Sequence, residues 1–523
     1  MTRSKSFYLL IITGVLAIYY LFVGIYLNKL GYTNFESLFY IEKARVVFDG
    51  LGNRIKVMGL TAPILPFYGM FFFFITCPVT LSPVIASALG MAGLFLMMAR
   101  ALVRRFNSDF YLYVLVILFL FHPGILYAAC SGKGTYLVLI SFFLFFLNIL
   151  KFYRSNTTFH ISVASIFLVV LVFCDYKFIW LTLFFIPLVL SIAIQSLNLS
   201  EKESIFRLFL SFNSPSLRRK LISKTFALYI IIFILPIAAI GSYKLLNLTH
   251  ANDLNYFIES PYATWTVISD RINYDQVTLG SESSFFPQDL SLLISAKALM
   301  FCPMILVALY MFRESTYQIL TLLTPFAFIE FLHIKYDKIF ITYEYYLIFL
   351  ILALLCLMFK AREVRKQKVL KIVLAILVPI QIYTGYIFLN RSMIKEEQNF
   401  ISMLLNRNED DTQNDNRDLA DYINSLPSSS NVLVDDAVAY PVAAYINNTR
   451  QLTMPYEDEF TSAIETPDKY DDYVLIATAK NPVTGYTQVN DKYITTIQTI
   501  NSRLKFRKVF ENDNWVLYHI LSN

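Results

Sequence analysis

The sequence predicts a polytopic α-helical membrane protein with about eleven transmembrane helices and a small α/β domain outside the membrane at its C-terminal end. Its 523 residues are 56% hydrophobic and only 16% charged, with a mean hydropathy of +0.54, whereas soluble proteins carry about 25% charged residues. Apolar runs long enough to cross a bilayer recur as far as residue 389. The ten-residue alternating segments of a membrane β-barrel are missing from the sequence.

The apolar segments define a transmembrane domain over residues 1–389. The first predicted span, 7–28, is too long for an ordinary signal peptide. The other predicted spans are 82–102, 110–128, 134–153, 158–174, 178–196, 225–245, 291–312, 318–334, 340–360 and 369–389. With a cytoplasmic N-terminus, this count places the Arg and Lys clusters inside, as the positive-inside rule requires. It places the loops 29–81 and 246–290 outside, together with the chain from residue 390 onward.

The first external loop, 29–81, is unusually polar and charged for a connection between spans, and we expect it to hold catalytic or substrate-binding groups. Residues 35–48 alternate apolar and charged side chains, which predicts an amphipathic helix lying in the membrane interface. Residues 60–77 are apolar enough to cross the membrane, but Pro63 and Pro66 interrupt their start. A full crossing would also invert the positive-inside pattern. We therefore predict a juxtamembrane or dipping helix there.

The second external loop, 246–290, combines acidic and aromatic residues. The acids are Asp253, Glu259, Asp270, Asp275, Glu282 and Asp289, and the aromatic residues beside them include Tyr256, Phe257, Tyr262, Trp265 and Tyr274. Aromatic rings next to hydrogen-bonding acids suit a carbohydrate. An aromatic belt at the membrane interface gives the same composition, and we favour the belt.

A polar connector, 390–415, leads to a predicted external α/β domain over 416–523. Buried strands at Asn431–Asp435, Tyr473–Thr478 and Trp515–Ile520 alternate with helical patterns. Neither a GxGxxG motif nor a P-loop is present, so nucleotide chemistry is not indicated. The five cysteines lie in or beside apolar runs, which indicates neither a disulfide framework nor a Cys/His metal cluster.

Among the acids of the first loop, Glu36 is the candidate for chemistry. A carboxylate at a partly dry lipid–water boundary has a raised pKa and can act as a general base on a hydroxyl. The alternative is an exposed acid on the polar side of an interfacial helix. Glu42 and Asp49 are better placed to pair with Lys43 or Arg45.

Two single lysines lie at the external boundary of apolar helices. Lys133 occupies a short turn in CSGKGT, and Lys177 follows Asp175 in CDYKFIW. Each can hold a lipid phosphate, although snorkelling to the interface is the usual role of a boundary lysine. Farther along, Glu344 and His333 flank the external turn between the spans 318–334 and 340–360. Glu344 falls close to the apolar zone, where acids are functional candidates, but a structural ion pair with Lys335 or Lys338 is an equal alternative.

The motifs around these residues resemble the GT-C superfamily of membrane glycosyltransferases, of the mannosyltransferase and aminoarabinose-transferase type. Glu36, Tyr40 and the pair Ala44-Arg45 match the acidic residue, Tyr and Ala-Arg pair of its first external loop, with Glu where Asp is usual. The stretch His122–Phe146 is similar to its Pro-x-x-Leu-x-x-Ala-x-x-Gly segment. Lys177 and the following Pro187 resemble its Thr-Lys-Gly-Pro segment without the Gly-Pro. The C-terminal part looks like the external domain of several members.

The resemblance implies inverting transfer of a sugar from a polyprenyl-phosphate donor to a glycan, lipid or protein acceptor. Glu36 would be the base, and Lys177, then Lys133 or Arg45, would hold the phosphate. Tyr40, His333 and Glu344 are further substrate-binding candidates. A second acid, often found in the family where Lys133–Thr135 stand here, is missing. No cofactor is therefore assigned, and a divalent metal (Mg²⁺ or Mn²⁺) is left as an option.

Other classes remain open from the sequence. A polysaccharide polymerase or ligase is expected to have arginine-rich external loops, whereas Arg271 is the only arginine in the sequence of the loop 246–290. A transporter favours internal repeats and midplane charges, which we do not find. A non-catalytic pseudoenzyme would explain the missing second acid. Nucleic acid is not an expected partner, because the basic clusters adjoin apolar segments. We expect a bacterial inner membrane, with a periplasmic or extracellular C-terminal domain, rather than an endoplasmic reticulum facing its lumen.

Overall fold

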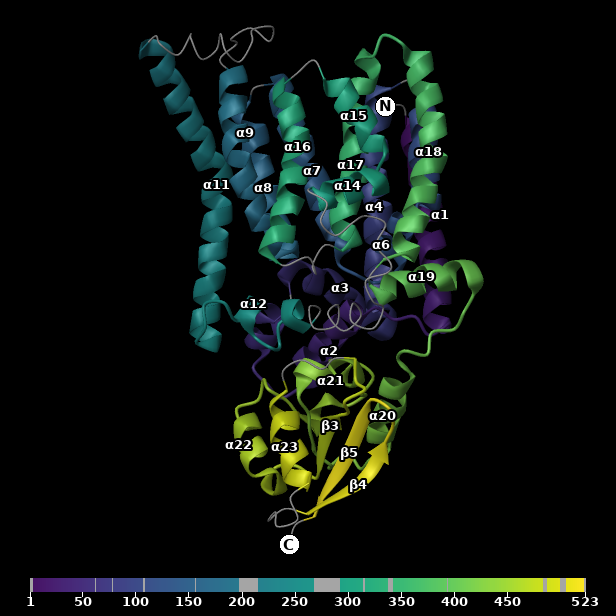
Figure 1. Ribbon diagram of the computed structural model, residues 1–523, viewed down its shortest axis with the longest axis vertical. Helices are drawn as coiled ribbons and strands as arrows, with labels where there is room; N and C mark the ends of the chain where they lie inside the picture. The colour runs from purple at the N-terminus through teal and green to yellow at the C-terminus, as the bar shows by residue number, and fades with distance from the viewer. Residues whose placement is uncertain are drawn as a thin grey trace.

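The computed structural model consists of a long helical bundle with a small α/β domain attached to one end (Figure 1). The N-terminus lies at the opposite end of the bundle, and we call the end next to the C-terminal domain the domain end. The structure describes residues 3–61, 63–77, 79–106, 109–155, 157–196, 215–267, 292–313, 316–336, 342–392, 394–482, 487–498 and 505–521.

Each of the eleven predicted spans coincides with a helix or with a bent pair of helices. They are α1 (Arg3–Lys29), α4 (Ser82–Arg105), α5 with α6 (Phe110–Phe121, Pro123–Cys130), α7 (Thr135–Ser155), α8 (Thr158–Cys174), α9 (Leu181–Ser196), α11 (Pro215–Ala251), α14 with α15 (Leu293–Phe301, Met304–Phe312), α16 (Thr316–Lys335), α17 (Tyr343–Lys360) and α18 (Gln367–Asn390). Seven of the described helices are long and apolar enough to cross a membrane, or nine if each bent pair is one span. The chain is therefore a polytopic α-helical membrane protein, as its composition predicts.

Two features of the bundle bear on the site. The pair α5–α6 bends by 61° just before Pro123, and the pair α14–α15 bends by 102° next to Pro303. Both bends lie at a proline because proline cannot donate the backbone hydrogen bond that continues a helix. Helix α17 lies at the centre, with 89% of its span buried, whereas α11 has only 22% of its span buried. Since α17 begins at the domain end, its first turn is held firmly by the packing of the rest of the helix.

Short helices lie between the bundle and the C-terminal domain (Figure 1). They are α2 (Phe35–Asp49), a π-helical turn η1 (Lys56–Leu60), α3 (Ile64–Thr76), α12 (Tyr256–Glu259) and α19 (Lys395–Asn406). Helix α3 has 13 residues, too few for a full crossing, which agrees with a dipping or juxtamembrane helix.

The predicted helix over 35–48 exists as α2, and its polar side packs against the C-terminal domain instead of facing water. Most residues of α2 are buried, and these include the charged residues Glu42 and Lys43. The reason is that the C-terminal domain covers the polar side of α2: the Lys43 ammonium donates to Asp436 and to the Tyr456 hydroxyl. A pattern of charges that would face water in an isolated loop here faces another domain.

The C-terminal domain is built on a five-stranded mixed sheet with the order β2-β1-β3-β5-β4. Its strands are β1 (Val432–Leu433), β2 (Leu452–Thr453), β3 (Tyr473–Ala477), β4 (Lys505–Glu511) and β5 (Trp515–Leu521), and its helices are α20 (Asn414–Ser425), α21 (Asp436–Ala443), α22 (Phe460–Glu465) and α23 (Gln488–Gln498). β1 pairs in parallel with β2 and β3, whereas β5 pairs antiparallel with β3 and β4. The predicted strands β1, β3 and β5 are present, and β2 and β4 are additional.

The two faces of this sheet pack into two different hydrophobic cores. Leu433, Val474 and Ile476 belong to a small core with α22 and α23, while residues of the opposite face, such as Val434 and Leu475, join the large core that continues into the bundle. This alternation follows the strand period of two. Residues 268–290 of the loop 246–290 lie outside the described residues, and these include its acids from Asp270 onward.

Candidate active site

A cleft opens at the domain end of the bundle, where several helices begin or end. Its empty space, open mouth included, measures about 980 Å³. Four of the residues predicted from the sequence line it: Glu36, Lys133, Lys177 and Glu344. They come from α2, the α6–α7 turn, the 3₁₀ turn η3 (Tyr176–Trp180) and α17. Residues spread over three hundred positions of the chain therefore meet in one place.

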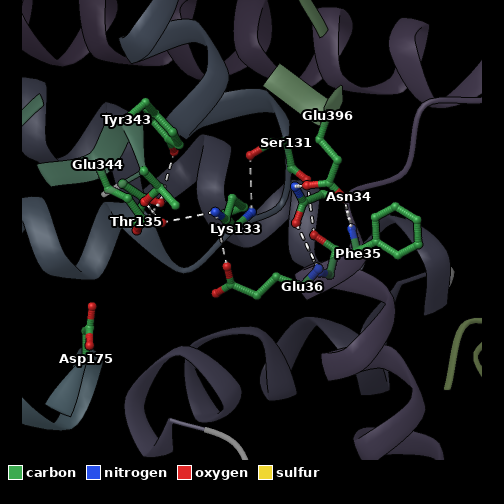
Figure 2. Close-up of polar contacts among 12 residues, drawn as sticks. Asn34, Phe35, Glu36, Ser131, Lys133, Thr135, Asp175, Tyr343, Glu344 and Glu396 are labelled. Carbon is green, nitrogen blue, oxygen red and sulfur yellow. Dashed lines mark hydrogen bonds and ion pairs between the residues drawn. The ribbon is translucent and has the colours of Figure 1, made fainter. Parts of the chain in front are cut away.

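The first group of charges in the cleft is centred on Lys133, and we call it the cleft cluster: Glu36, Tyr40, Lys133, Thr135 and Glu344. The Lys133 ammonium donates to Glu344 Oε1 (3.0 Å) and lies 3.4 Å from Glu36 Oε2. The Tyr40 hydroxyl donates to Glu36 Oε1 (2.9 Å), and the Thr135 hydroxyl donates to Glu344 Oε2 (3.1 Å). Figure 2 shows Lys133 between the two carboxylates. The Lys133 ammonium thus contacts two carboxylates, one from α2 and one from α17.

The backbone holds these groups for identifiable reasons. Asn34 caps α2, and its side-chain oxygen accepts from the Glu36 N–H (3.0 Å), so Glu36 is fixed in the first turn. The turn that carries Lys133 begins at Gly132, whose φ of +81° favours glycine. Gly134 lies so close to Pro66 that an added Cβ would come within 2.5 Å of the proline ring. Glycines on both sides therefore allow Lys133 to project between the two acids.

The environment shifts the proton affinity of Glu36 and Lys133. The exposed fraction of the Glu36 side chain is 15%, and burial raises the pKa of its carboxyl, although the positive charge of Lys133 opposes the shift. Burial lowers the pKa of Lys133, but the carboxylates of Glu344 and Glu36 more than compensate and raise it well above its ordinary value. Lys133 is thus a permanent cation beside a carboxylate that binds protons more readily than usual.

A second group of charges surrounds Lys177. The Lys177 ammonium lies 3.4 Å from Asp175 Oδ2, 4.2 Å from the centre of the Trp265 ring and 4.9 Å from that of Tyr345. The Tyr345 hydroxyl donates to Asp175. Aromatic faces attract a cation without neutralising it. The Lys177 ammonium therefore lines the cleft between one carboxylate and two aromatic rings.

One side of the cleft is apolar. Its lining there includes Val138 of α7, Val172 and Phe173 of α8, and Ile240 and Tyr243 of α11. Because α11 is among the least buried of the long helices, this wall lies toward the outside of the bundle. The cleft therefore joins a charged inner part to an apolar wall.

Three predicted residues do not join the cleft lining. Tyr40 is buried and reaches the cleft only through its hydrogen bond to Glu36. Arg45 projects the other way, and its Nε donates to the carbonyl of Ala444 in the C-terminal domain (3.0 Å). His333 lies on α16 outside the lining residues. Glu344 pairs with Lys133 rather than with Lys335, whose ammonium lies over the Trp180 ring (4.3 Å); Lys338 lies outside the described residues.

The acids of the cleft offer little to a divalent metal. Within the part of the chain that the structure describes, no group of three or more His, Cys, Asp or Glu side chains could hold a metal ion. The space between the Glu36 and Glu344 carboxylates is filled by the Lys133 ammonium. These residues therefore do not fit a resident Mg²⁺ or Mn²⁺, and we assign no step to a metal.

Several contributing residues were not among the candidates from the sequence. Asp175 forms the ion pair with Lys177, and its position two residues before that lysine was an available signal. Trp265 stood in the aromatic loop attributed to an interfacial belt, whereas its ring lies against Lys177. Thr135 and Tyr343 contribute through hydroxyls alone, and nothing in their local sequence distinguishes them.

Comparisons with known proteins extend the description of the fold. No known family profile and no curated protein matches the sequence. Among solved structures, ArnT from Cupriavidus metallidurans bound to undecaprenyl phosphate is similar over 97% of both chains, with a TM-score of 0.54 and 12% sequence identity. The oligosaccharyltransferase of Archaeoglobus fulgidus in its apo form matches 91% of this chain and 70% of its own, with a TM-score of 0.43 and 12% identity. The likeness to ArnT covers both the bundle and the C-terminal domain, and it shows that this chain shares the overall fold of that protein.

Proposed function

We propose that this protein is a glycosyltransferase that moves a sugar from a polyprenyl-phosphate donor to an acceptor hydroxyl at the domain end of the bundle. The observation that carries the proposal is the meeting, in one cleft, of a buried carboxylate with a raised pKa and two lysines held by separate acids. The likeness to ArnT, which was solved with undecaprenyl phosphate, supports a lipid-phosphate donor.

Glu36 is the proposed general base. Its carboxylate accepts hydrogen bonds from Tyr40 and contacts Lys133, which keeps it ionised and oriented before the reaction. Because burial raises its pKa, it can take a proton from an acceptor hydroxyl at near-neutral pH. The proton ends on Glu36, and the acceptor oxygen attacks the anomeric carbon.

The departing group is a lipid phosphate, which needs positive charge rather than a strong acid. As the new bond from the acceptor oxygen to the anomeric carbon forms, the bond from that carbon to the phosphate oxygen breaks on the opposite face, and the configuration inverts. The electron pair of the broken bond remains on the phosphate. Lys177, held over Trp265 and Tyr345, would receive this charge, and the Lys133 ammonium is a second possible contact for the phosphate.

The apolar wall gives the lipid part of the donor a place. Val172 and Phe173 of α8 and Ile240 of α11 border the cleft on the side of the sparsely buried α11. A polyprenyl chain in the bilayer could contact these side chains while its phosphate reaches the lysines. Entry from the membrane would avoid extracting the lipid into water.

The test is transfer of labelled sugar from a polyprenyl-phosphate hexose or pentose to an acceptor by the purified protein in lipid nanodiscs. Wild type should transfer, and Glu36→Gln should lower the rate by about 10²–10⁴-fold, the contribution typical of a general base. Asp49→Asn is the matched control, since Asp49 is an exposed acid at the other end of the same helix. Transfer that persists unchanged in Glu36→Gln would contradict the assignment of the base. Absence of transfer by wild type across a panel of donors and acceptors would contradict the function.

A further inference from the structure

Two consecutive glutamates in the connector between the bundle and the C-terminal domain touch the two helices that carry the carboxylates of the cleft cluster. Glu396 accepts hydrogen bonds from the Phe35 N–H and from the Asn34 side-chain amide, both at 2.7 Å. Glu397 accepts from the Tyr343 N–H at 3.3 Å. Phe35 and Tyr343 are the first residues of α2 and α17, so each contact lies one residue before Glu36 or Glu344.

The bonds continue from the connector into the cleft cluster. On one side, Glu396 binds the amide nitrogen of Asn34, whose oxygen accepts from the Glu36 N–H (Figure 2). This fixes which way the Asn34 amide points. On the other side, the Tyr343 hydroxyl donates to Thr135, and Thr135 donates to Glu344. Each glutamate of the connector is thus linked to one acid of the cluster through a short chain of hydrogen bonds.

Several helix N-termini supply hydrogen-bond donors at this point. Helix N-termini carry partial positive charge and N–H groups without partners in the helix. Glu396 and Glu397 lie in the first turn of α19 itself and contact the N-termini of α2 and α17. Three helix N-termini therefore converge on two carboxylates, and one of these, Glu397, is only 2% exposed. Replacing either acid leaves a helix N–H without its acceptor.

We infer that Glu396 and Glu397 are positioning residues that clamp the first turns of α2 and α17, and so hold Glu36 and Glu344 on either side of Lys133. They do not touch the substrate in this scheme. The inference concerns the connector 390–415, which no step of the proposed reaction uses. Its consequence for catalysis rests on the proposed function, but the clamp itself does not.

The experiment compares wild type, the double variant Glu396→Ala/Glu397→Ala, and Glu409→Gln, an exposed acid on the same connector. Residue-resolved hydrogen exchange in nanodiscs measures the Phe35 and Tyr343 amides directly. We expect both amides to exchange at least tenfold faster in the double variant and unchanged in the control. In a transfer assay, kcat should fall at least tenfold while the KM for the donor stays within twofold, because Lys177 is not held by the clamp.

The outcomes separate the clamp from the function. If the Phe35 and Tyr343 amides of the double variant exchange as slowly as in wild type, the clamp is overturned. It is also overturned if both amides exchange faster while an active enzyme keeps its wild-type kcat. Faster exchange in a protein whose wild type transfers no sugar supports the clamp and counts against the proposed function. If the double variant does not fold, Glu396→Gln serves instead. Its carbonyl can still accept from Phe35, but its NH₂ group faces the Asn34 amide, so we expect a smaller fall in kcat and a normal unfolding temperature.

Discussion

Helix α2 contributes residues to two lysine–carboxylate clusters that have similar groups but different exposure to solvent. In the cleft cluster, Lys133 lies between Glu36 and Glu344, and the three side chains are 9–20% exposed to the cleft. In what we call the interface cluster (Glu42, Lys43, Asp436 and Tyr456), Lys43 contacts Glu42 at 2.8 Å and also Asp436, and all three charged side chains are fully buried. Each cluster therefore has one cation and two acids.

The two clusters differ in whether a substrate can reach their carboxyl groups. With two acids and one cation in a dry site, one carboxyl binds its proton more tightly. In the interface cluster, burial and the Asp436 charge raise the pKa of Glu42 to about 8, despite Lys43. In the cleft cluster burial likewise raises the pKa of Glu36. Of these two acids, Glu36 lines the cleft whereas Glu42 is fully buried, so the raised proton affinity of Glu36 is the one that a substrate can reach.

The largest effect on activity, apart from the loss of Glu36, should come from Lys133→Met. This change removes the charge between Glu36 and Glu344 while keeping the length of the side chain. Loss of one preorganised electrostatic group costs about 10²–10³-fold in kcat. Transfer measured per folded molecule checks this, and a rate within threefold of wild type would show that the two clusters do not differ in role.

Lys43→Met should affect stability instead. It leaves Asp436 buried without its cation, and breaking a buried pair in this way costs about 3–5 kcal/mol. Thermal unfolding in detergent should show a markedly lower midpoint, while molecules that remain folded keep their kcat. A variant with normal stability and little activity would place Lys43 in the chemistry.

Lys177→Ala should act on the donor. A charge-assisted hydrogen bond to phosphate contributes about 1.5–3 kcal/mol, which corresponds to roughly 10–100-fold weaker binding. Binding of undecaprenyl phosphate to the protein, measured without any acceptor, tests this separately from turnover. Affinity equal to that of wild type would remove Lys177 from the phosphate site.

A smaller difference should appear in the pH dependence of stability. The folded-state pKa of Glu42, about 8, exceeds its unfolded value of about 4.3. Its contribution to stability is therefore complete at low pH and is lost as the pH rises toward 8. Because burial also raises the pKa of Glu397 and of Asp471 to about 7, the informative quantity is the difference between wild type and Glu42→Gln. The unfolding midpoint of the variant should fall less between pH 5 and pH 8; parallel curves would contradict the shift.

The smallest expected effect is that of chelation. The Lys133 ammonium already occupies the space between the two carboxylates, so EDTA should leave the transfer rate within twofold. A rate that collapses with EDTA and returns with Mg²⁺ or Mn²⁺ would mean that Lys133 moves aside for a metal.

Much of the fold follows from local sequence, and much of the site does not. The spans and the helix 35–48 are visible because hydropathy and periodicity are properties of neighbouring residues. Glu36, Lys133 and Lys177 could be chosen because each is a charge at an apolar boundary. The partnership of Lys133 with Glu344, 211 residues away, depends on how α17 packs in the centre of the bundle. Arg45 was assigned to phosphate because its sequence context does not reveal the C-terminal domain that covers it.

The most direct test of the account uses two neighbouring glutamates of one helix and the same substitution. Glu36→Gln and Glu42→Gln each replace a carboxyl by an amide of equal size, in the cleft cluster and in the interface cluster respectively. Sugar transfer and thermal unfolding would be measured on both variants in the same nanodiscs. We predict that Glu36→Gln loses transfer with its unfolding midpoint nearly unchanged, and that Glu42→Gln retains transfer with an altered pH dependence of unfolding. Equal loss of transfer in both variants, or in Glu42→Gln alone, would contradict the account.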